Sequence, residues 1–329
     1  MKLLVTGGCG FIGSNFIKHM LAKYDYEIWN VDKLTYAGNI HNLGDLTKHS
    51  NYHFHQADIN EYATLHYMIR ENKIDTIINF AAESHVDNSI ENSDEFIKTN
   101  INGTHTLLKL LHEFPIKKFI QISTDEVYGT LTEDDEPFTE DTPIAPNSPY
   151  AASKASADML CRSFYETYKY PITITRCSNN YGPNQYPEKL IPLMIEKAKN
   201  NEKLPVYGDG RNIRDWIHVQ DHCEAIDVVL HDGKDGDVYN IGGQDERRNI
   251  EIVETIIKGI GGGEIEYVED RLGHDWRYAM NTEKIEFTLD WEPKISFKEG
   301  IKELLNENSD SRKSIIREQE EDKRFHFQN

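Results

Sequence analysis

Residues 2–14 read KLLVTGGCGFIGS, and this stretch decides the fold. Lys2–Val5 is a short apolar run typical of a buried strand, and the apolar spacing over residues 16–21 is that of a helix. Between them the glycines fit two dinucleotide fingerprints, G-x-G-x-x-G at Gly8, Gly10 and Gly13, and G-x-x-G-x-x-G at Gly7, Gly10 and Gly13. A side chain in this loop would hold a pyrophosphate away from the backbone amides at the helix start. The strand–loop–helix context therefore predicts a dinucleotide-binding turn, with a ligand-free glycine turn as the alternative.

A second apolar run, Ile28–Val31, ends in Asp32, about 20 residues beyond the glycine loop. A carboxylate at this place can hold both hydroxyls of an adenosine ribose, and it would repel a 2′-phosphate. We therefore expect NAD rather than NADP, although Lys33 beside Asp32 argues in the other direction. The pair Asp58-Ile59 follows the next strand-like run, where an adenine ring could sit.

Further strand-like runs at 52–55, 76–80, 119–122 and 172–175 alternate with helical patterns such as 65–70 and 104–111. This alternation predicts an α/β fold with a doubly wound parallel (Rossmann) sheet. After Arg176 the composition becomes rich in Pro, Gly, Asn and Tyr, which indicates a smaller C-terminal α+β substrate lobe. The expected division is a dinucleotide-binding domain over 1–177 and 213–245, a substrate lobe over 178–212 and 246–305, and a charged C-terminal tail over 306–329.

Composition restricts the possible functions. The chain has 329 residues, 38% hydrophobic and 28% charged, as in an ordinary globular protein with a well-buried core. A formal charge of −20 argues against nucleic-acid binding and against adhesion to anionic membranes. No apolar run approaches the roughly 20 residues of a membrane helix. The four cysteines form no CxxC pair, so we expect neither a disulfide framework nor a metal site, and a cytoplasmic location.

Residues 120–129, IQISTDEVYG, combine a buried strand with two hydroxyls and two adjacent carboxylates. In an open parallel sheet, ligands bind beyond the carboxyl ends of the strands, so Asp125 and Glu126 would face the active crevice. Neighbouring carboxyl groups can take different protonation states, one acting as an acid and the other as a base. A solvated loop carrying two ordinary acids is the alternative.

A second chemical pattern follows at Ser148-Pro149-Tyr150, which has the cap and the proline of a good helix start. Tyr150 and Lys154 then lie four residues apart on one helix face. Tyrosine, with a reference pKa of about 10, is a poor base at neutral pH. A nearby ammonium and the positive helix end are expected to favour its phenolate.

With these motifs the chain resembles the dTDP-glucose 4,6-dehydratases, a family in the extended, nucleotide-sugar-modifying branch of the short-chain dehydrogenase/reductase superfamily. The resemblance covers nearly the whole chain up to about residue 305, and the Asp125-Glu126 pair and the PEKLIP segment (187–192) are its most specific parts. Cys9 and Leu272 depart from the usual alanine and proline, and neither carries a proposed chemical group. The matching stretches are TGGCGFIGS (6–14), VDKLTYAGN (31–39), AAESHVDNSI (81–90), STDEVYG (123–129), SPYAASKA (148–155), NNYGPNQYPEKLIP (179–192), YGDGRNIRDWIHV (207–219) and DRLGHDWRY (270–278).

The resemblance implies three groups of site residues. The catalytic group is Thr124, Asp125, Glu126, Tyr150 and Lys154. The cofactor group is Gly7, Gly10, Phe11, Ile12, Gly13, Asp32, Lys33, Leu34, Thr35, Asp58, Ile59, Ala81, Ala82, Glu83, Thr99, Tyr150, Lys154 and Asn180. The nucleotide-sugar group is Ser84, Thr124, Asn179, Lys189, Leu190, Pro205, Val206, Tyr207, Arg214, Asn249, Arg271, His274 and Tyr278. Lys189, Arg214 and Arg271 are the cations expected to face the substrate diphosphate.

The activity implied is a hydro-lyase that converts dTDP-glucose to dTDP-4-keto-6-deoxyglucose by oxidation, elimination and internal return of a hydride, with NAD as cofactor. A plain dehydrogenase would leave Asp125 and Glu126 without a task. The usual family role is deoxysugar (rhamnose-type) biosynthesis by a homodimer formed through the Tyr150 helix and its neighbour. Two alternatives remain: another nucleotide-sugar 4-epimerase or dehydratase of the superfamily, and a non-catalytic dinucleotide-binding regulator.

Overall fold

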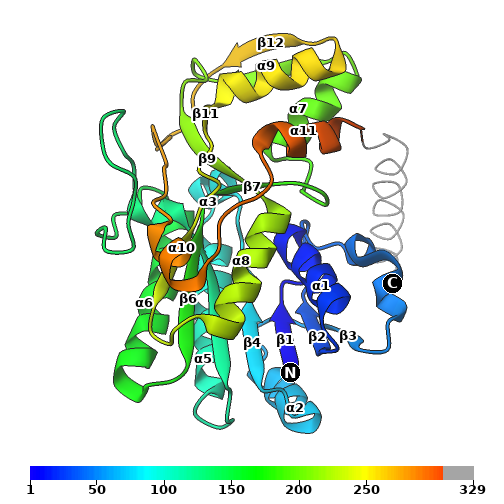
Figure 1. The fold of residues 1–329 in the computed structure, drawn as a ribbon, viewed down its shortest axis with the longest axis vertical. Coiled ribbons are helices and arrows are strands. Elements are labelled where there is room, and N and C mark those ends of the chain that lie inside the picture. The colour runs from blue at the N-terminus through cyan, green and yellow to red at the C-terminus, as the bar shows by residue number, and fades with distance from the viewer. Residues whose placement is uncertain (307–329) are drawn as a thin grey trace.

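A parallel sheet of seven strands crosses the larger part of the molecule in the computed structural model, which describes residues 1–306 (Figure 1). All its neighbouring strands run parallel, in the order β10-β6-β5-β4-β1-β2-β3. The strands are β1 (Lys2–Thr6), β2 (Glu27–Asp32), β3 (Tyr52–Gln56), β4 (Thr76–Asn79), β5 (Lys118–Thr124), β6 (Ile172–Cys177) and β10 (Val238–Ile241). β4, β5 and β6 are buried along their whole length, which explains why they read as apolar runs rather than as alternating patterns.

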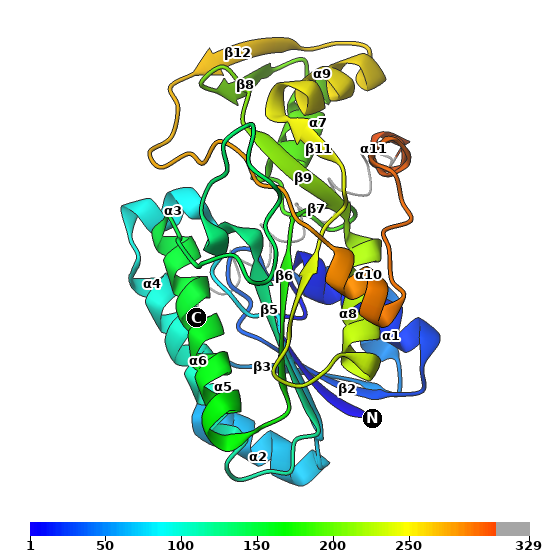
Figure 2. The same ribbon diagram turned by 60° about the vertical axis from the view of Figure 1, so that its left-hand side comes forward.

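Helices cover both faces of this sheet, so the predicted doubly wound fold is confirmed (Figure 2). One face carries α2 (Tyr62–Asn72), α5 (Thr104–Leu110) and α6 (Pro149–Tyr168), and the other carries α1 (Phe11–Lys23) and α8 (Val219–Asp232). Phe16 and Ile17 of α1 belong to the core on the second face, and Leu107 and Leu110 of α5 belong to the core on the first. The shorter elements around the sheet are η1 (Ile40–Lys48), α3 (Val86–Glu91), α4 (Asp94–Phe96), η2 (Ile97–Gly103), η3 (Asp125–Tyr128) and α10 (Glu283–Leu289).

The order of the strands reverses direction between β1 and β4, because β2 and β3 lie to one side of β1 and β5 and β6 lie to the other side of β4. In open α/β sheets, ligands bind at such a reversal, beyond the carboxyl ends of the strands. The glycine loop after β1 and residues 80–84 after β4 flank this point. The topology therefore places the binding crevice where the sequence motifs predicted it.

A smaller lobe stands beyond the same ends of the strands, at the top of Figure 1. Its core contains Ile191, Leu204 and Ile252, all fully buried. The lobe consists of β7 (Asn179–Tyr181), α7 (Leu190–Lys199), β8 (Lys203–Tyr207), β9 (Ile213–His218), β11 (Glu246–Arg248), α9 (Asn249–Ile260), β12 (Glu264–Val268) and α11 (Phe297–Asn306).

One part of the expected division needs correction. β9 pairs with β7 and β11 in a three-stranded sheet, so the chain returns to the large sheet with α8 and β10 rather than at residue 213. Trp216 of β9 packs into the core of the lobe, and Ile217 beside it belongs to the core that α1 and α8 form with the large sheet. Asn306 ends the described part of α11, and the tail expected over 306–329 otherwise lies outside the described residues.

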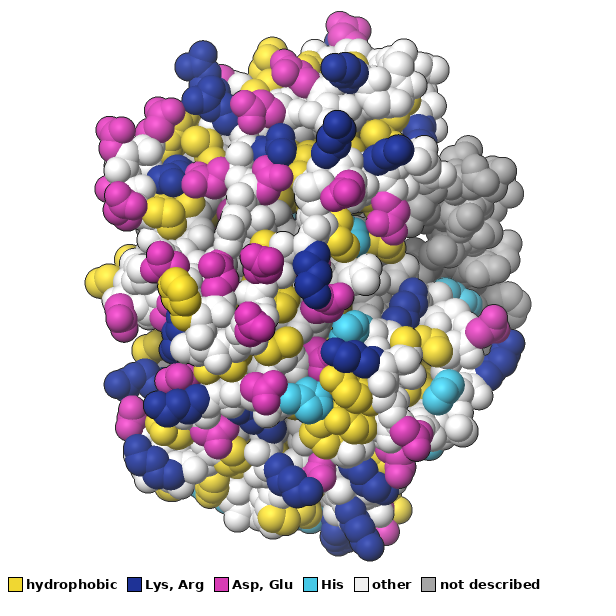
Figure 3. All heavy atoms as spheres, in the orientation of Figure 1, with side chains coloured by type: hydrophobic (Ala, Val, Ile, Leu, Met, Phe, Trp, Pro, Cys, Tyr) yellow, Lys and Arg dark blue, Asp and Glu magenta, His cyan; other side chains and the backbone are white. Residues whose placement is uncertain are grey.

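The surface in Figure 3 carries acidic and basic side chains interspersed over both parts of the molecule, with hydrophobic side chains in small groups between them. On this face the acidic excess is therefore spread out rather than gathered into one patch. Within residues 1–306, no helix combines the length and the hydropathy that a bilayer-crossing segment requires.

Candidate active site

A cavity of about 320 Å³ opens at the reversal point of the sheet, and the glycine loop forms one of its walls. Gly7, at the end of β1, has a φ of +70°, and a Cβ on it would lie 2.7 Å from the backbone nitrogen of Ala81. A Cβ on Gly13 would lie 2.4 Å from the carbonyl oxygen of Gly7. Only glycine fits at either position. The loop therefore brings the backbone amides at the start of α1 to the cavity, where they can hold a pyrophosphate.

Asp32, the last residue of β2, lines the same cavity and is held by two backbone amides. Its Oδ2 accepts a hydrogen bond from Cys9 N (2.9 Å), and its Oδ1 accepts one from Leu34 N (2.8 Å). Burial raises the pKa of Asp32, and these two amides act against that rise. Each carboxylate oxygen still has lone-pair capacity for a ribose hydroxyl. The Lys33 ammonium lies 3.0 Å from the Asp58 carboxylate, so its charge is already paired.

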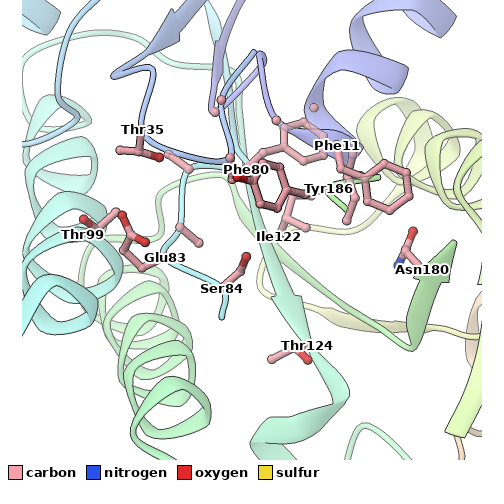
Figure 4. Close-up of a pocket in the computed structure, with 18 of the residues that line it drawn as sticks. Phe11, Thr35, Phe80, Glu83, Ser84, Thr99, Ile122, Thr124, Asn180 and Tyr186 are labelled. Carbon is pink, nitrogen blue, oxygen red and sulfur yellow. The ribbon is translucent and has the colours of Figure 1, made fainter. Parts of the chain in front are cut away.

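One cavity is lined by the glycine loop, by the start of α1 and by Asp32, whose carboxylate has free acceptor capacity. These three features fit a bound dinucleotide. Figure 4 shows the residues between them, with Phe11, Phe80 and Ile122 as apolar lining and Glu83 and Thr99 as polar lining. The one predicted cofactor residue outside the cavity lining is Leu34. Its contribution is the backbone amide that orients Asp32.

The predicted catalytic residues line this cavity as well, and they come from two elements. β5 ends in Thr124, and the short helix η3 then carries Asp125 and Glu126. Thr124 Oγ1 donates to Asp125 Oδ1 (3.1 Å) and accepts from Glu126 N (3.3 Å), so one hydroxyl fixes both acids. Figure 4 shows Thr124 at the C-terminal end of the strand.

The other element is α6, which begins at Pro149 with Ser148 as its cap, Ser148 Oγ accepting from Ala151 N (3.0 Å). Tyr150 and Lys154 follow one turn apart and both line the cavity. Lys154 Nζ donates to Ile122 O of β5 (2.6 Å). This bond ties α6 to β5 and holds the ammonium beside the strand that carries Thr124.

The two carboxyl groups differ in environment as an acid and a base should. Burial raises the pKa of Asp125 well above its ordinary value, and the neighbouring Glu126 raises it further. Burial also raises the pKa of Glu126, but the positive charges of Arg271, Arg214 and Lys189 oppose this rise. These surroundings favour the protonated form of Asp125, and they give support to the charged form of Glu126.

The surroundings of Tyr150 disfavour its phenolate, contrary to the expectation from the sequence. Burial raises the pKa of its phenol well above the ordinary value, and the Glu126 carboxylate adds to that rise. Burial also disfavours the charged form of Lys154, and it therefore lowers the pKa of this ammonium group. In the protein alone, desolvation therefore outweighs the attraction between ammonium and phenolate on which the sequence-based argument relied. Forming the phenolate needs further positive charge in the cavity.

The predicted nucleotide-sugar residues divide into two sets. Ser84, Thr124, Asn179 and Lys189 line the cavity. Arg214 and Arg271 do not line it, yet their charges act on Glu126, so they lie near that carboxyl group. The remaining predicted residues that do not line the cavity are Leu190, Pro205, Val206, Tyr207, Asn249, His274 and Tyr278.

For Val206 and Arg214, the structure limits which atoms a ligand could contact. The Val206 side chain is buried in the core of the lobe, because it faces inward on β8, so only its backbone is available to a ligand. Arg214 donates to the carbonyl oxygens of Ile213 (2.7 Å) and Asp275 (2.9 Å), and its guanidinium lies 4.2 Å from the centre of the Tyr278 ring. Much of its hydrogen-bonding capacity is therefore already used.

Sequence reasoning missed several lining residues. Five of them, Val31, Ala57, Phe80, Ser123 and Ser178, directly flank predicted residues at strand ends, and a wider window there would have found them. Gln185, Tyr186 and Glu188 instead come from the loop before α7, for which the strand pattern gives no signal. The missed residues are Val31, Ala37, Gly38, Ala57, Phe80, Ile122, Ser123, Cys177, Ser178, Gln185, Tyr186 and Glu188.

The fold and the cavity define a dinucleotide-dependent enzyme of the extended short-chain dehydrogenase/reductase class, with Asp125 and Glu126 in the same cavity as Tyr150 and Lys154. The chain belongs to the GDP-mannose 4,6 dehydratase family, whose model matches residues 4–304.

Its relatives agree with this assignment. The chain is 50% identical to the low-salt glycan biosynthesis protein Agl12 of Haloferax volcanii, over 93% of this chain and 98% of that one. It is 53% identical to dTDP-glucose 4,6-dehydratase from Bacillus anthracis, solved in complex with NAD, with a TM-score of 0.87 over 93% of this chain and 95% of that one. It is 43% identical to dTDP-glucose 4,6-dehydratase from Streptomyces venezuelae, solved with NAD bound, with a TM-score of 0.90 over 93% and 96%.

Proposed function

We propose that this chain is an NAD-dependent hydro-lyase that converts dTDP-glucose to dTDP-4-keto-6-deoxyglucose and water. One observation carries the proposal: Tyr150, Lys154, Asp125 and Glu126 line the same cavity as the glycine loop and Asp32. An oxidation at the sugar needs the first pair, and an elimination needs an acid and a base in addition. The 43–53% identity to dTDP-glucose 4,6-dehydratases supports this substrate.

Bound NAD supplies a hydride acceptor with a positively charged ring. Asp32 would hold the adenosine ribose, the start of α1 the pyrophosphate, and the C-terminal ends of β4 and β5 the reacting end. Tyr150 accepts the proton of the hydroxyl on sugar carbon four, and Lys154 stabilises the resulting phenolate. The ketone formed at carbon four makes the hydrogen on carbon five acidic. Glu126 removes this proton, and Asp125 donates its own to the departing hydroxyl on carbon six, which leaves as water. Return of the hydride of carbon four to carbon six and of the proton on Glu126 to carbon five would complete the product.

The nucleotide half of the substrate is assigned to the lobe side of the cavity. Lys189 donates to Ser84 O (3.1 Å), which leaves two of its three ammonium hydrogens for a diphosphate oxygen. Arg271 is held loosely, 3.8 Å from the Asp87 carboxylate. We assign the diphosphate to these two cations, because Arg214 is committed to backbone carbonyls. The product would enter deoxysugar biosynthesis of the rhamnose type.

We also propose that the enzyme acts as a cytoplasmic homodimer that pairs through α6 and its neighbours. The outward face of α6 carries Ala152, Ser156, Met159 and Ser163, with the exposed Arg162 between the last two. Ile97 on the adjoining η2 is 47% exposed, and Met159 is 42% exposed. An apolar surface at this place fits a self-complementary contact. The four free cysteines fit a reducing compartment.

The test is to incubate the purified protein with dTDP-glucose, with and without added NAD, and to follow the sugar nucleotide by mass spectrometry. Loss of one water without net consumption of NAD is expected. UDP-glucose serves as the matched control for specificity toward the nucleotide base of the substrate. A product of unchanged mass would instead indicate a 4-epimerase, and binding of NAD with no conversion of either sugar would indicate a regulator.

A further inference from the structure

A chain of buried polar contacts lies beneath the catalytic residues and includes none of them. Arg176 Nε donates to Asp158 Oδ2 (2.9 Å), and Arg176 Nη1 donates to the Tyr128 hydroxyl (2.9 Å). Tyr128 in turn donates to Asn240 Oδ1 (2.7 Å). All four side chains are at most 3% exposed. Burying an ion pair at this depth costs much of what the attraction between the charges returns, so stability alone explains it poorly.

The position of these contacts connects them with the reaction. Asp158 lies on α6, one turn after Lys154 and on the same face as Tyr150 and Lys154. Tyr128 closes η3, the short helix that carries Asp125 and Glu126. Arg176 lies on β6 between them, directly opposite Ser123 in the strand pairing. One guanidinium therefore joins the element of the Tyr–Lys pair to the element of the acid–base pair.

In the described part of the chain, the buried charged groups around Arg176 are two cations and one carboxylate. Lys154 and Arg176 are the cations, and Asp158 is the carboxylate bonded to Arg176. Because Arg176 neutralises Asp158, the charge of Lys154 is left uncompensated until Tyr150 loses its proton. Without Arg176, Asp158 would compensate Lys154 instead, and a phenolate at Tyr150 would bring one excess negative charge into a buried region.

We propose that Arg176 and Asp158 are positioning residues for the reaction, which rests on the proposed function. Arg176 occupies the Asp158 carboxylate, so that the Lys154 ammonium serves Tyr150, and it holds η3 in place through Tyr128.

The other titratable groups around this layer are few. Tyr150 faces Glu126 and Asp125 of η3 and Cys177 of β6. Lys154 faces Asp158 and Cys161 of its own helix and Cys177 of β6. Tyr128 faces Arg176, Asp158 and Glu140. Burial raises the pKa of both cysteine thiols, so they stay neutral at working pH. Glu126 and Asp125 are unchanged in the variants below, so a difference between variants reports the Arg176–Asp158 pair.

The test is the pH dependence of turnover in four variants. Arg176→Met should move the acidic limb of the kcat profile to higher pH by about one unit, the lower end of the effect of a neighbouring charge. Asp158→Asn should move it in the opposite direction, because two cations then face Tyr150. The double variant Asp158→Asn/Arg176→Met removes both charges and should return the limb to the wild-type position. Arg176→Lys keeps the charge and should leave the limb in place.

A second readout does not depend on turnover. The purified protein is titrated by ultraviolet absorbance of tyrosinate, and the same variant carrying Tyr150→Phe is subtracted, which isolates Tyr150 among the 17 tyrosines. Its titration should shift in the same directions as the limb. Tyr128→Phe is the matched control: it removes a buried hydrogen bond from Arg176 without changing the charge, so it should lower the melting temperature and leave the Tyr150 titration in place.

Opposite shifts in the single variants that cancel in the double variant support the proposal. Shifts in one direction, or slower turnover with the limb and the titration unmoved, would overturn it and leave a purely structural pair. If Arg176→Met does not fold, the double variant is compared with the wild type alone. An acidic limb displaced from the wild-type position in that variant would overturn the proposal. Failure of the wild-type protein to dehydrate dTDP-glucose would count against the proposed function alone, because the absorbance titration still tests the charge coupling.

Discussion

We expect the elimination step to depend on Glu126, because it is the carboxylate whose charged form nearby cations support. In Glu126→Gln an amide that cannot accept the proton replaces it at nearly the same volume. Oxidation at carbon four should persist, and dehydration should slow by about 10²–10⁴, the usual contribution of one general base. Rapid-mixing absorbance should show NADH accumulating while product forms slowly. Glu136→Gln, at an exposed position, is the control, and full dehydratase turnover by Glu126→Gln would contradict the assignment.

Tyr150→Phe removes one hydroxyl and leaves the ring that packs edge-on against Phe96. Without that oxygen, no group at this place can take the proton from the hydroxyl on carbon four, so oxidation and everything after it should stop. Rapid mixing with dTDP-glucose should then show no rise in NADH absorbance. Calorimetry with NAD is the control, and the affinity should change little. Normal accumulation of NADH in this variant would rule out the base role.

At the scale of elements, the glycine loop and α1 act as one unit. A Cβ at position 13 would meet the Gly7 carbonyl at 2.4 Å and push the loop away from the cavity. Gly13→Ala should lower the free energy of unfolding by about 1–3 kcal/mol, as overpacking does, and weaken NAD binding measured by calorimetry. Gly262→Ala is the matched control, since its nearest neighbour would lie 3.9 Å from the new Cβ. Equal NAD affinity in both variants would refute the role of the loop.

The packing of α1 against α8 depends on Asp227, whose Oδ2 lies 2.8 Å from His19 Nε2 and 2.7 Å from Lys23 Nζ. Burial acts to raise the pKa of Asp227, but these hydrogen bonds outweigh it and lower the pKa to about 2. A carboxyl group with a lowered folded-state pKa stabilises the fold above its unfolded value, near 4, and loses this contribution as pH falls toward 2.

The contribution of Asp227 is about 2 kcal/mol at neutral pH. Asp227→Asn should therefore be less stable than wild type in urea unfolding at pH 7, and the gap should shrink as the pH approaches 2. A gap that stays constant with pH would show that its charge is not responsible.

How much could be predicted from sequence also differs between elements. The sheet, the glycine loop, Asp32 and the Tyr150–Lys154 pair follow from local spacing, and the structure brings them to one cavity. Arg176 could not be assigned a role, because its partners lie on α6 and η3, and only the tertiary fold brings them together. β9 was assigned to the wrong sheet for the same reason: an apolar strand pattern does not specify which strand it pairs with. The raised pKa of Tyr150 depends on burial, which a helix spacing does not reveal.

For the whole molecule, the outward face of α6 bears directly on assembly. It carries the small or apolar side chains of Ala152, Ser156, Met159 and Ser163 beside Arg162, and the exposed Ile97 of η2 lies on an element that packs against α6. Facing a second copy, this surface would bury Met159 of both protomers near a two-fold axis. A carboxylate there would meet its own counterpart in the contact, and the exposed cation of this helix, Arg162, already lies 3.9 Å from the Glu166 carboxylate. Desolvation and like-charge repulsion would then act together against the dimer.

Met159→Glu should therefore convert the proposed dimer to a monomer in sedimentation-velocity experiments at micromolar concentration, with unchanged secondary structure by circular dichroism. The control is Phe287→Glu, because Phe287 is 84% exposed on α10, away from α6, and its replacement should leave the dimer intact. Since Tyr150 lies in the first turn of α6, loss of the dimer should also let this turn fray and reduce turnover. A Met159→Glu protein that sediments as wild type would place the subunit contact on another face.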